Sequence, residues 1–273
     1  MSTRARLDVL LVSRGLVESR ERARALILAG HVTLDGHEAG KAGMLVDTHA
    51  DIRVAGPEIP WVSRGGVKLA HALDVFTIDP TLRLALDIGA STGGFTDVLL
   101  QRGARRVIAV DVGHGQLHYR LRVDPRVSVL ERVNARRLTM ADLPDAGSGV
   151  DVVTIDVSFI SLRHILPVVP ALLAAGADVV ALVKPQFEAG RAEVRRGGLV
   201  VDPAVHARVV DEVASVASAV GLTRVGLVDS PITGAEGNRE FLMHLRSLGQ
   251  TPEDPPDRAR NRWTGNKPDA PPR

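Results

Sequence analysis

The sequence contains no cysteine. This absence excludes disulfide bonds, thiolate metal sites and every mechanism that uses a cysteine nucleophile. Aromatic residues are also scarce, with two tryptophans, one tyrosine and five phenylalanines among 273 residues, although hydrophobic residues make up 45% of the chain. We therefore expect a sizeable core built from Val, Leu, Ile and Ala.

Long hydrophobic runs are absent as well. The longest apolar stretch, residues 168–183, is interrupted by Pro170, Gly176 and Asp178. It therefore predicts a helix followed by a strand, because a membrane span needs about 20 apolar residues. The apolar run at residues 9–12 is too short for the core of a signal peptide. We expect a soluble, cytoplasmic protein.

The charge is nearly balanced, with 34 basic and 32 acidic residues, but the isoelectric point is about 9.4 because arginine supplies most of the positive charge. Arginine binds phosphate groups through two parallel hydrogen bonds. Net charge alone does not indicate a nucleic-acid partner, so the clustering of the arginines decides.

The first region of the chain predicts a small unit of two helices and a few strands. Ser19 fits a helix N-cap, Gly30 fits a helix stop, and Asp35-Gly36 is a hairpin turn signal. Residues 4–24 contain six arginines and three acids, so this unit carries a basic helix. Ordinary solvated surface charges are the alternative interpretation.

The second region, residues 62–246, alternates strands and helices. Strands are predicted at 82–87, 106–111, 150–156, 178–183 and 222–229, with a last one at 240–245, and helices at 96–102, 162–175 and 203–220. Continuous apolar strands separated by helices favour a parallel sheet covered on both faces. Residues 249–273 hold six of the sixteen prolines and almost no apolar residues, which is typical of a disordered tail.

A glycine-rich turn follows the first predicted strand of this region. Asp87 ends the strand, and Gly89, Gly93 and Gly94 follow in a spacing that differs from the G-x-G-x-x-G of dinucleotide-binding proteins. Asp111 ends the next strand, where a carboxylate binds ribose hydroxyls. The combination favours S-adenosylmethionine; another nucleotide or a purely structural turn is the alternative.

Two further strand ends carry charges, Asp156 and Lys184. Methylation of pyrimidine carbon 5 is excluded because it uses a cysteine nucleophile. Methylation of an exocyclic amine uses an Asn/Asp-Pro-Pro-aromatic motif, whereas residues 156–159 are DVSF. An oxygen acceptor remains, and a ribose hydroxyl needs a base or a cation at its oxygen. Taken singly, Asp156, Lys184, Lys68 and Glu240 could each be a solvated charge.

Several motifs together resemble a known family. They are RLDVLLVSRGLVESRERARALI, SRGGVKL, LDIGASTGGFTD, VDVVTIDVSFISL, LVKPQFE, RRGGLVVD and GNREFL. The second region resembles the FtsJ-like 2′-O-ribose methyltransferases, and the chain from Arg4 to about Arg246 resembles the TlyA family of rRNA (cytidine-2′-O)-methyltransferases, whose members are often labelled haemolysins.

The resemblance implies an α/β fold: a Rossmann-like methyltransferase domain with a seven-stranded sheet and helices on both faces, preceded by a small α+β S4-like RNA-binding domain. The implied boundaries are 1–58 for the S4-like domain, 59–62 for the linker, 63–248 for the methyltransferase domain and 249–273 for the tail. Pro60 in the linker is expected to set a stiffer angle than other members have.

The resemblance also implies a catalytic tetrad of Lys68, Asp156, Lys184 and Glu240. Lys184 would be the central lysine, oriented by Asp156 and Glu240, and Lys68 an outer cation near the acceptor ribose. The implied cofactor is S-adenosylmethionine, held by Asp87, Gly89, Ala90, Ser91, Thr92, Gly93, Gly94, Phe95, Thr96, Asp111, Val112 and Asn134.

Arginines of both domains are candidates for RNA contacts, with solvated side chains as the alternative. They are Arg4, Arg6, Arg14, Arg20 and Arg22 in the first domain and Arg64, Arg136, Arg137, Arg195 and Arg196 in the second. The implied activity is 2′-O-methylation of cytidine in 16S or 23S rRNA within ribosomal subunits, by a monomer without metal or membrane association. An inactive RNA-binding assembly factor and a membrane-active haemolysin are the alternatives.

Overall fold

The computed structural model describes residues 4–17, 19–28, 31–54, 60–234 and 237–247. The chain divides into two compact units, Met1–Pro60 and Trp61–Arg273, which are described separately below. The tail expected at 249–273 lies outside the described residues, as does Ile59 of the expected linker.

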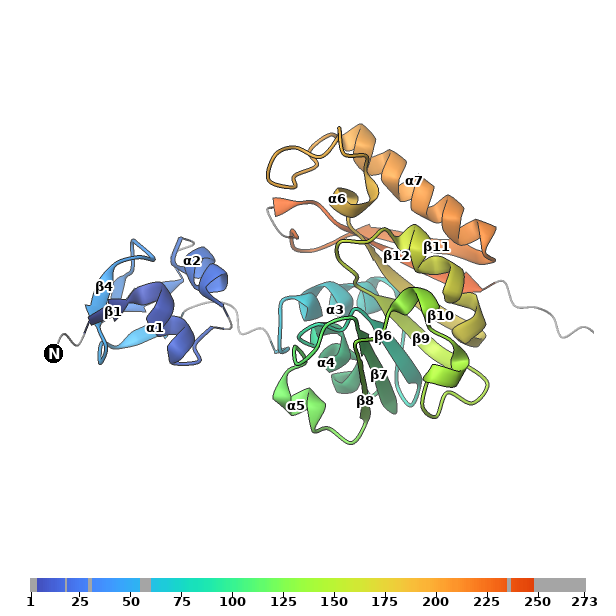
Figure 1. Cartoon of the computed structure of the whole chain (residues 1–273), viewed down its shortest axis with the longest axis horizontal. Helices are drawn as coiled ribbons and strands as arrows, with labels where there is room; N and C mark the ends of the chain where they lie inside the picture. Colours follow the sequence, from blue (N-terminus) through green and yellow to red (C-terminus); the bar gives the residue numbers. More distant parts are fainter. Residues whose placement is uncertain (1–3, 18, 29–30, 55–59, 235–236, 248–273) are drawn as a thin grey trace, which may run out of the picture. The chain divides into compact units, whose positions relative to one another are not determined.

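The first unit packs two helices against short strands (Figure 1). Its elements are β1 (Arg4–Arg6), α1 (Leu7–Ser13), α2 (Arg20–Leu28), β2 (Val32–Leu34), β3 (His37–Glu38), β4 (Leu45–Asp47) and β5 (Ile52–Val54). β1 pairs with β4, and β2 pairs with both β3 and β5, all antiparallel. The hairpin turn predicted at Asp35-Gly36 is confirmed between β2 and β3, and both residues have positive φ. Leu7, Leu11 and Ile27 are fully buried in its aliphatic core.

The second unit is built on a seven-stranded sheet in the order β11-β12-β10-β9-β6-β7-β8. The strands are β6 (Leu84–Ile88), β7 (Arg106–Asp111), β8 (Val127–Glu131), β9 (Val150–Ile155), β10 (Leu173–Val183), β11 (Leu222–Asp229) and β12 (Phe241–Ser247). β6 to β10 are parallel, as expected, but β12 runs antiparallel to both of its neighbours, so the sheet is mixed. The sequence predicts no strand at β8, which is an edge strand without a buried run.

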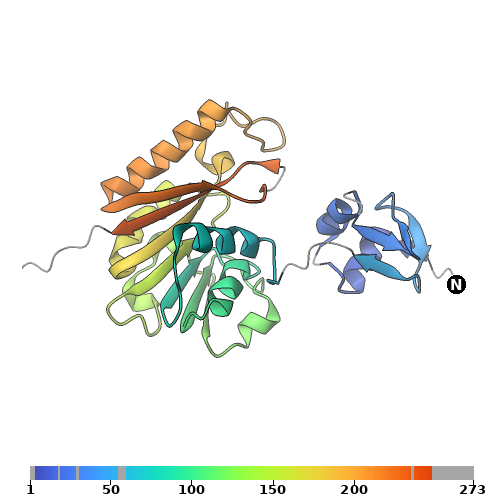
Figure 2. The same cartoon turned by 180° about the vertical axis from the view of Figure 1, so that it is seen from behind.

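Helices cover both faces of this sheet (Figures 1 and 2). α3 (Gly65–Phe76) and α4 (Gly94–Gln101) pack on one face, and α7 (Pro203–Ala219) packs on the other. Successive residues of β6 alternate between the two cores: Leu84, Leu86 and Ile88 face the α7 side, and Ala85 faces α3 and α4. α5 (Tyr119–Arg122) and α6 (Pro185–Glu188) are single turns in loops at strand ends.

The helix predicted over 162–175 is wrong. The structure has three short 3₁₀ turns there, Leu162–His164, Leu166–Val168 and Pro170–Leu172, and β10 already begins at Leu173. Pro167 and Pro170 explain the difference, since each lacks a backbone N–H and its ring collides with the carbonyl four residues earlier in an α-helix. Among the described residues, no helix has both the length and the apolar character that a membrane span requires.

A buried charge cluster fixes the amino-terminal half of β10 to its neighbours. Asp178 is almost fully buried, and its carboxylate accepts hydrogen bonds from Arg246 Nε at 2.7 Å, His244 Nε2 at 2.8 Å and Arg83 Nη1 at 2.8 Å. Burial alone raises the pKa of this carboxyl, but the three donors outweigh burial and hold it far below its usual range. The cluster lies where Asp178 pairs with Arg246 in the β10–β12 register.

We expect Asp178→Asn to lower the free energy of unfolding by about 3 kcal/mol, because His244 and two arginines lose their shared anion. Because the folded pKa is depressed, wild-type stability should be constant near neutral pH and decline as the pH falls below about 4. Urea denaturation measures both effects. The control is Asp211→Asn, an exposed carboxylate 3.4 Å from Arg224, which should change stability by less than about 0.5 kcal/mol. Equal effects of the two variants would contradict the assignment.

Candidate active site

The carboxyl ends of the central parallel strands and the start of β12 meet at one edge of the sheet. Asp156 directly follows β9, and its N–H donates to the carbonyl of Ile88 at the end of β6, at 2.9 Å. Val183 pairs with Phe241 in the antiparallel β10–β12 ladder, so the residues beyond this pair, Lys184 and Glu240, also lie at this edge. Ligands of open α/β sheets bind at such an edge.

Lys184 is held by two side chains of the segment after β9. Its Nζ lies 2.6 Å from Asp156 Oδ1 and donates a hydrogen bond to Ser158 Oγ at 2.9 Å. The Lys184 side chain is 10% exposed. An ammonium has three N–H donors, so one remains for another partner.

Lys68, on the first turn of α3, forms a second buried ion pair. Its Nζ lies 2.5 Å from Glu240 Oε2, and the two side chains are 11% and 2% exposed. The alternative of a solvated Lys68 is therefore wrong, and so is that of a solvated Glu240. Removing a charge from water is costly unless a partner compensates, which this geometry provides.

The pairing differs from the expected one in one respect. The resemblance implies that Glu240 orients Lys184, but among the described residues Glu240 forms its ion pair with Lys68 and not with Lys184. The site thus consists of two lysine–carboxylate pairs, each joining residues far apart in the sequence.

The backbone before β12 closes tightly around Glu240. Ser230 N–H donates to the Glu240 carbonyl at 2.9 Å, and Gly234 N–H donates to the Asn238 carbonyl at 2.8 Å. A Cβ atom at Gly234 would overlap the Glu240 carboxylate. The absence of a side chain at Gly234 therefore leaves room for the Glu240 carboxylate in its ion pair.

A pocket of about 480 Å³ opens beside Asp156. It is lined by the ends of β6 and β7 and by the loops after β8 and β9. Six of the predicted catalytic and cofactor-binding residues line it: Gly89, Ser91, Asp111, Val112, Asn134 and Asp156. Gly89 has φ of +87°, and a Cβ there would lie 2.5 Å from the Asp156 carbonyl oxygen, so the turn and the catalytic segment approach closely only because residue 89 is glycine.

Asp111 organises the rim of this pocket. Its Oδ2 accepts a hydrogen bond from Ser91 N–H at 2.8 Å, and its Oδ1 accepts one from Gly113 N–H at 2.6 Å. A carboxylate has about four acceptor positions, so Asp111 can still accept bonds from the two hydroxyls of a ribose.

Seven of the twelve residues predicted to bind the cofactor do not line the pocket. They are Asp87, Ala90, Thr92, Gly93, Gly94, Phe95 and Thr96. Asp87 is fully buried, and its carboxylate accepts hydrogen bonds from Thr96 Oγ1 at 2.6 Å and Thr154 Oγ1 at 2.9 Å. These bonds join β6, α4 and β9 beneath the glycine-rich turn, so Asp87 and Thr96 support the turn from inside.

Sequence reasoning missed several residues of the site. Gln116, Val133, Val157, Ser158, Phe159 and Ile160 line the pocket, and Ser158 also contacts Lys184. The Phe159 ring is 92% exposed. In the sequence, the DVSF segment pointed to Asp156 and to the amine-methylation motif that it lacks, but not to Ser158, because the contact of Ser158 with Lys184 depends on the spatial neighbourhood of β9 and β10.

Comparison with known proteins now adds to this geometry. Residues 61–247 match the model of the FtsJ-like methyltransferases, and residues 5–52 match that of the S4 domain. The chain is 51% identical over 249 residues to the 16S/23S rRNA (cytidine-2′-O)-methyltransferase TlyA of Mycobacterium tuberculosis, covering 90% of this chain and 91% of TlyA. It belongs to the TlyA family.

Two further proteins are similar to this chain over most of its length. YqxC of Bacillus subtilis, provisionally named an rRNA methyltransferase, is 50% identical over 252 residues, which cover 92% of this chain and 89% of YqxC. The structure of a protein from Streptococcus thermophilus, provisionally named a hemolysin, superposes with a TM-score of 0.74 at 43% identity and covers 90% of both chains. The TlyA family thus includes members with hemolysin names.

The arginines predicted to bind RNA fall into two groups in this TlyA-family chain. In the S4 domain, Arg6 and Arg20 surround the buried carboxylate of Asp8 together with Arg24, at 3.0–3.4 Å. These cations hold the pKa of Asp8 far below its usual range. Arg14 donates to the carbonyls of Thr48 and Ala50, at 2.6 and 2.7 Å. Arg6, Arg14 and Arg20 therefore have structural contacts within the S4 domain, and all ten candidate arginines are exposed or partly exposed.

We expect the Asp87 carboxyl to titrate with a pKa of about 6, raised chiefly by burial. Because the folded pKa is raised, its contribution to stability is complete below about pH 4 and is lost as the pH rises to about 6. Asp87→Asn has no carboxyl at this position and should not show this pH dependence. Between these pH values, the free energy of unfolding of wild type should therefore fall by up to about 3 kcal/mol relative to that of the variant. Urea denaturation across this range measures the difference.

Asp74→Asn is the control for this titration, since Asp74 is exposed and paired with Arg102. Its stability should follow that of wild type across the range. A stability difference between wild type and Asp87→Asn that does not change with pH would contradict the raised pKa.

Proposed function

We propose that this protein transfers a methyl group from S-adenosylmethionine to the 2′-hydroxyl of a cytidine in ribosomal RNA, acting on ribosomal subunits in the cytoplasm. The observation that carries the proposal is the pair of buried lysine–carboxylate contacts, Lys184–Asp156 and Lys68–Glu240, beside a pocket at the carboxyl edge of the sheet. The acceptor nucleotide follows from the TlyA enzyme of Mycobacterium tuberculosis, which is named for cytidine in 16S and 23S rRNA.

The pocket fits S-adenosylmethionine in three respects. Gly89 leaves its backbone open to the pocket, Asp111 retains acceptor positions for ribose hydroxyls, and apolar side chains such as Val112 and Val133 can enclose an adenine ring. S-adenosylmethionine supplies an electrophilic methyl group when bound. Asn134 lines the same wall, and its Oδ1 accepts from Arg136 N–H at 3.1 Å, which fixes its orientation.

Lys184 is proposed to act on the acceptor oxygen. A ribose hydroxyl is a weak nucleophile because its pKa is far above neutral, so the oxygen needs a neighbour that stabilises negative charge or takes the proton. Asp156 and Ser158 hold Lys184 Nζ in place and leave one of its donor positions free. A fixed ammonium therefore orients the oxygen for in-line attack and stabilises the negative charge that develops there, while the hydroxyl proton is released to solvent and S-adenosylhomocysteine is the leaving group.

Lys68 and Glu240 are proposed to form the outer part of the acceptor site. Burial of both side chains keeps the local dielectric low, so Lys68 exerts a stronger field on a nearby ribose than an exposed lysine would. Glu240 balances this charge and fixes its direction. The two lysines are thus proposed to stabilise the negative charge that develops at the acceptor oxygen.

RNA binding is proposed to involve the S4 domain, taken as residues 1–58, and exposed arginines of the methyltransferase domain, taken as residues 63–248. Arg136 lines the pocket, and Arg64, Arg137, Arg195 and Arg196 are exposed. Such side chains contact phosphates and position the RNA without reading its sequence. We propose that the protein acts as a monomer.

Methyl transfer from tritiated S-adenosylmethionine to purified ribosomal subunits tests the proposal. We expect Lys184→Ala to lower kcat by at least about a hundredfold, and Lys68→Met and Glu240→Gln to lower it by about tenfold or more. The double variant Lys68→Met/Glu240→Gln should have a kcat close to that of either single variant, because each substitution alone already removes the same ion pair. Cofactor affinity, measured by calorimetry, should be retained in all variants.

The control variant is Arg102→Ala, which breaks an exposed pair with Asp74 at the far end of α4 and should retain wild-type rates. Absence of transfer by wild type would overturn the proposed function. Wild-type rates in Lys184→Ala would overturn the role of this lysine. Mapping of the 2′-O-methyl group by primer-extension stops identifies the nucleotide.

We expect the double substitution of Arg195 and Arg196 by alanine to weaken binding to ribosomal subunits by about three- to tenfold at 0.1 M salt. Neither guanidinium has an ion pair within the part of the chain that the structure describes, so both can release counterions on binding phosphate. The slope of log Kd against log salt should fall by up to about 2. Filter binding at several salt concentrations measures this slope, and Arg224→Ala is the control. An unchanged slope in the double variant would show that neither arginine contacts the RNA.

A further inference from the structure

The segment after β9, residues 157–162, determines the surroundings of the central lysine. Ser158 Oγ accepts the hydrogen bond of Lys184, and Val157, Ser158, Phe159 and Ile160 line the pocket. Phe159 has φ of +62°, a conformation that a phenylalanine rarely adopts unless its surroundings impose it. Contacts from neighbouring elements must therefore hold residues 157–162 in this conformation.

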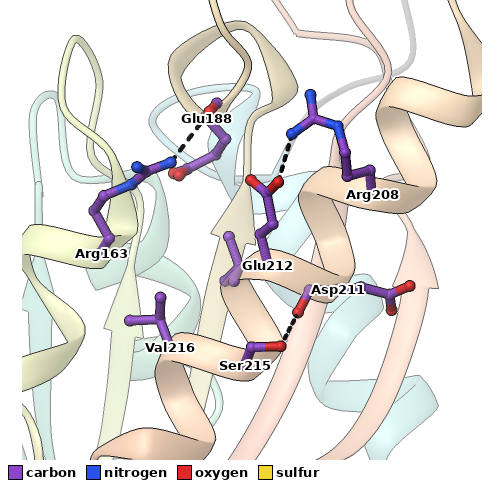
Figure 3. A pocket seen from close by; sticks show the side chains of 8 residues that line it. Arg163, Glu188, Arg208, Asp211, Glu212, Ser215 and Val216 are labelled. Atoms are coloured by element: carbon purple, nitrogen blue, oxygen red, sulfur yellow. Dashed lines mark hydrogen bonds and ion pairs between the residues drawn. The ribbon is translucent and has the colours of Figure 1, made fainter.

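α6, which begins directly after Lys184, makes the contacts that fix it. The Phe187 ring lies 5.2 Å from the Phe159 ring, between centroids. Glu188 Oε2 accepts a hydrogen bond from Ser161 Oγ at 2.5 Å, and Glu188 Oε1 accepts one from Leu162 N–H at 2.7 Å. Arg163 Nη2 donates to the Glu188 carbonyl at 3.4 Å (Figure 3). Both oxygens of one carboxylate thus hold the far end of the segment.

Glu188 is buried, and the proposed mechanism does not use it. A buried carboxylate is costly unless its oxygens are satisfied, and an apolar residue would fill the same space without that cost. Hydrogen bonds to a charged acceptor are about twice as strong as neutral ones and more strictly oriented. The hydrogen bonds to Ser161 and Leu162 therefore explain why a carboxylate, and not an apolar side chain, is buried at position 188.

We propose that Glu188 is a positioning residue for methyl transfer. It fixes residues 157–162 relative to α6, so that Ser158 meets Lys184 and the segment presents a constant wall to the acceptor nucleotide. Because Lys184 directly precedes α6 and Glu188 is the last residue of α6, the carboxylate ties the segment to the backbone that carries the lysine. The catalytic consequence rests on the proposed methyltransferase function, whereas the positioning itself does not.

Steady-state methyl transfer with Glu188→Ala, Glu188→Gln and Ser161→Ala tests the proposal. Glu188→Ala should lower kcat by about ten- to a hundredfold, because a displacement of about 1 Å has such an effect, while KM for S-adenosylmethionine changes by less than about threefold. Glu188→Gln should restore part of kcat, since its amide oxygen still accepts from Leu162 N–H, while its NH2 group competes with the Arg163 backbone N–H and Nε–H for the two acceptor positions of Ser161 Oγ. The kcat of Ser161→Ala should lie between those of Glu188→Ala and Glu188→Gln.

Glu212→Ala is the matched control. Glu188 and Glu212 both line a pocket of about 590 Å³ against α7, but Glu212 pairs with Arg208 one turn earlier on that helix (Figure 3). Among the described residues, Glu212 has no hydrogen bond or ion pair to residues 157–162 or to Lys184. It should retain wild-type rates. Equal kcat in Glu188→Ala and wild type, or equal losses in Glu188→Ala and Glu188→Gln, would overturn the proposal.

Hydrogen exchange separates this inference from the proposed function. In Glu188→Ala the amide of Leu162 should exchange at least about tenfold faster than in wild type, while amides of β6 and β7 keep their protection. Unchanged exchange at Leu162 overturns the positioning role whatever the activity. If wild type transfers no methyl group, the proposed function fails, and the exchange result alone decides whether Glu188 holds the segment.

Discussion

The antiparallel pairing of β12 with β10 is the constraint on which the site depends. Parallel strands bring only their carboxyl ends to one edge of a sheet, so a residue at the start of a strand reaches that edge only if its strand runs in the opposite direction. β12 does so, and it places Glu240 near Lys68 on α3. The Lys184–Asp156 pair needs only the parallel neighbours β9 and β10.

β10 links two charge clusters of different kinds. Residues 179–183 are apolar and buried, with Asp178 before them and Lys184 after them. Asp178 has three cationic or proton-donating partners, which hold the middle of the strand, while Lys184, directly after its carboxyl end, has carboxylate and hydroxyl partners. The Asp178 cluster fixes β10 in the sheet, and this fixed strand in turn positions Lys184 at the proposed active site.

Much of this fold could be predicted from the sequence because its signals are local. Apolar β-branched runs gave the central strands, and Asp35-Gly36 gave the hairpin turn. Pro167 and Pro170 were present but were outweighed by the apolar pattern around them, so a helix was expected where the structure has 3₁₀ turns. The partner of Glu240, the support role of Asp87 and the contact of Ser158 with Lys184 depend on distances between segments far apart in the chain, which no local pattern contains.

The register of β12 also governs which changes of chain length the fold can accept. Side chains alternate between the two faces of a sheet, so a one-residue insertion within β12 would turn Glu240 or the Asp178 contacts of His244 and Arg246 to the wrong face. An insertion before Gly234 leaves both clusters intact, provided that Ser230 still meets the Glu240 carbonyl. Length variation among related chains should therefore collect in surface loops such as the one between α6 and α7, while β12 keeps a constant length.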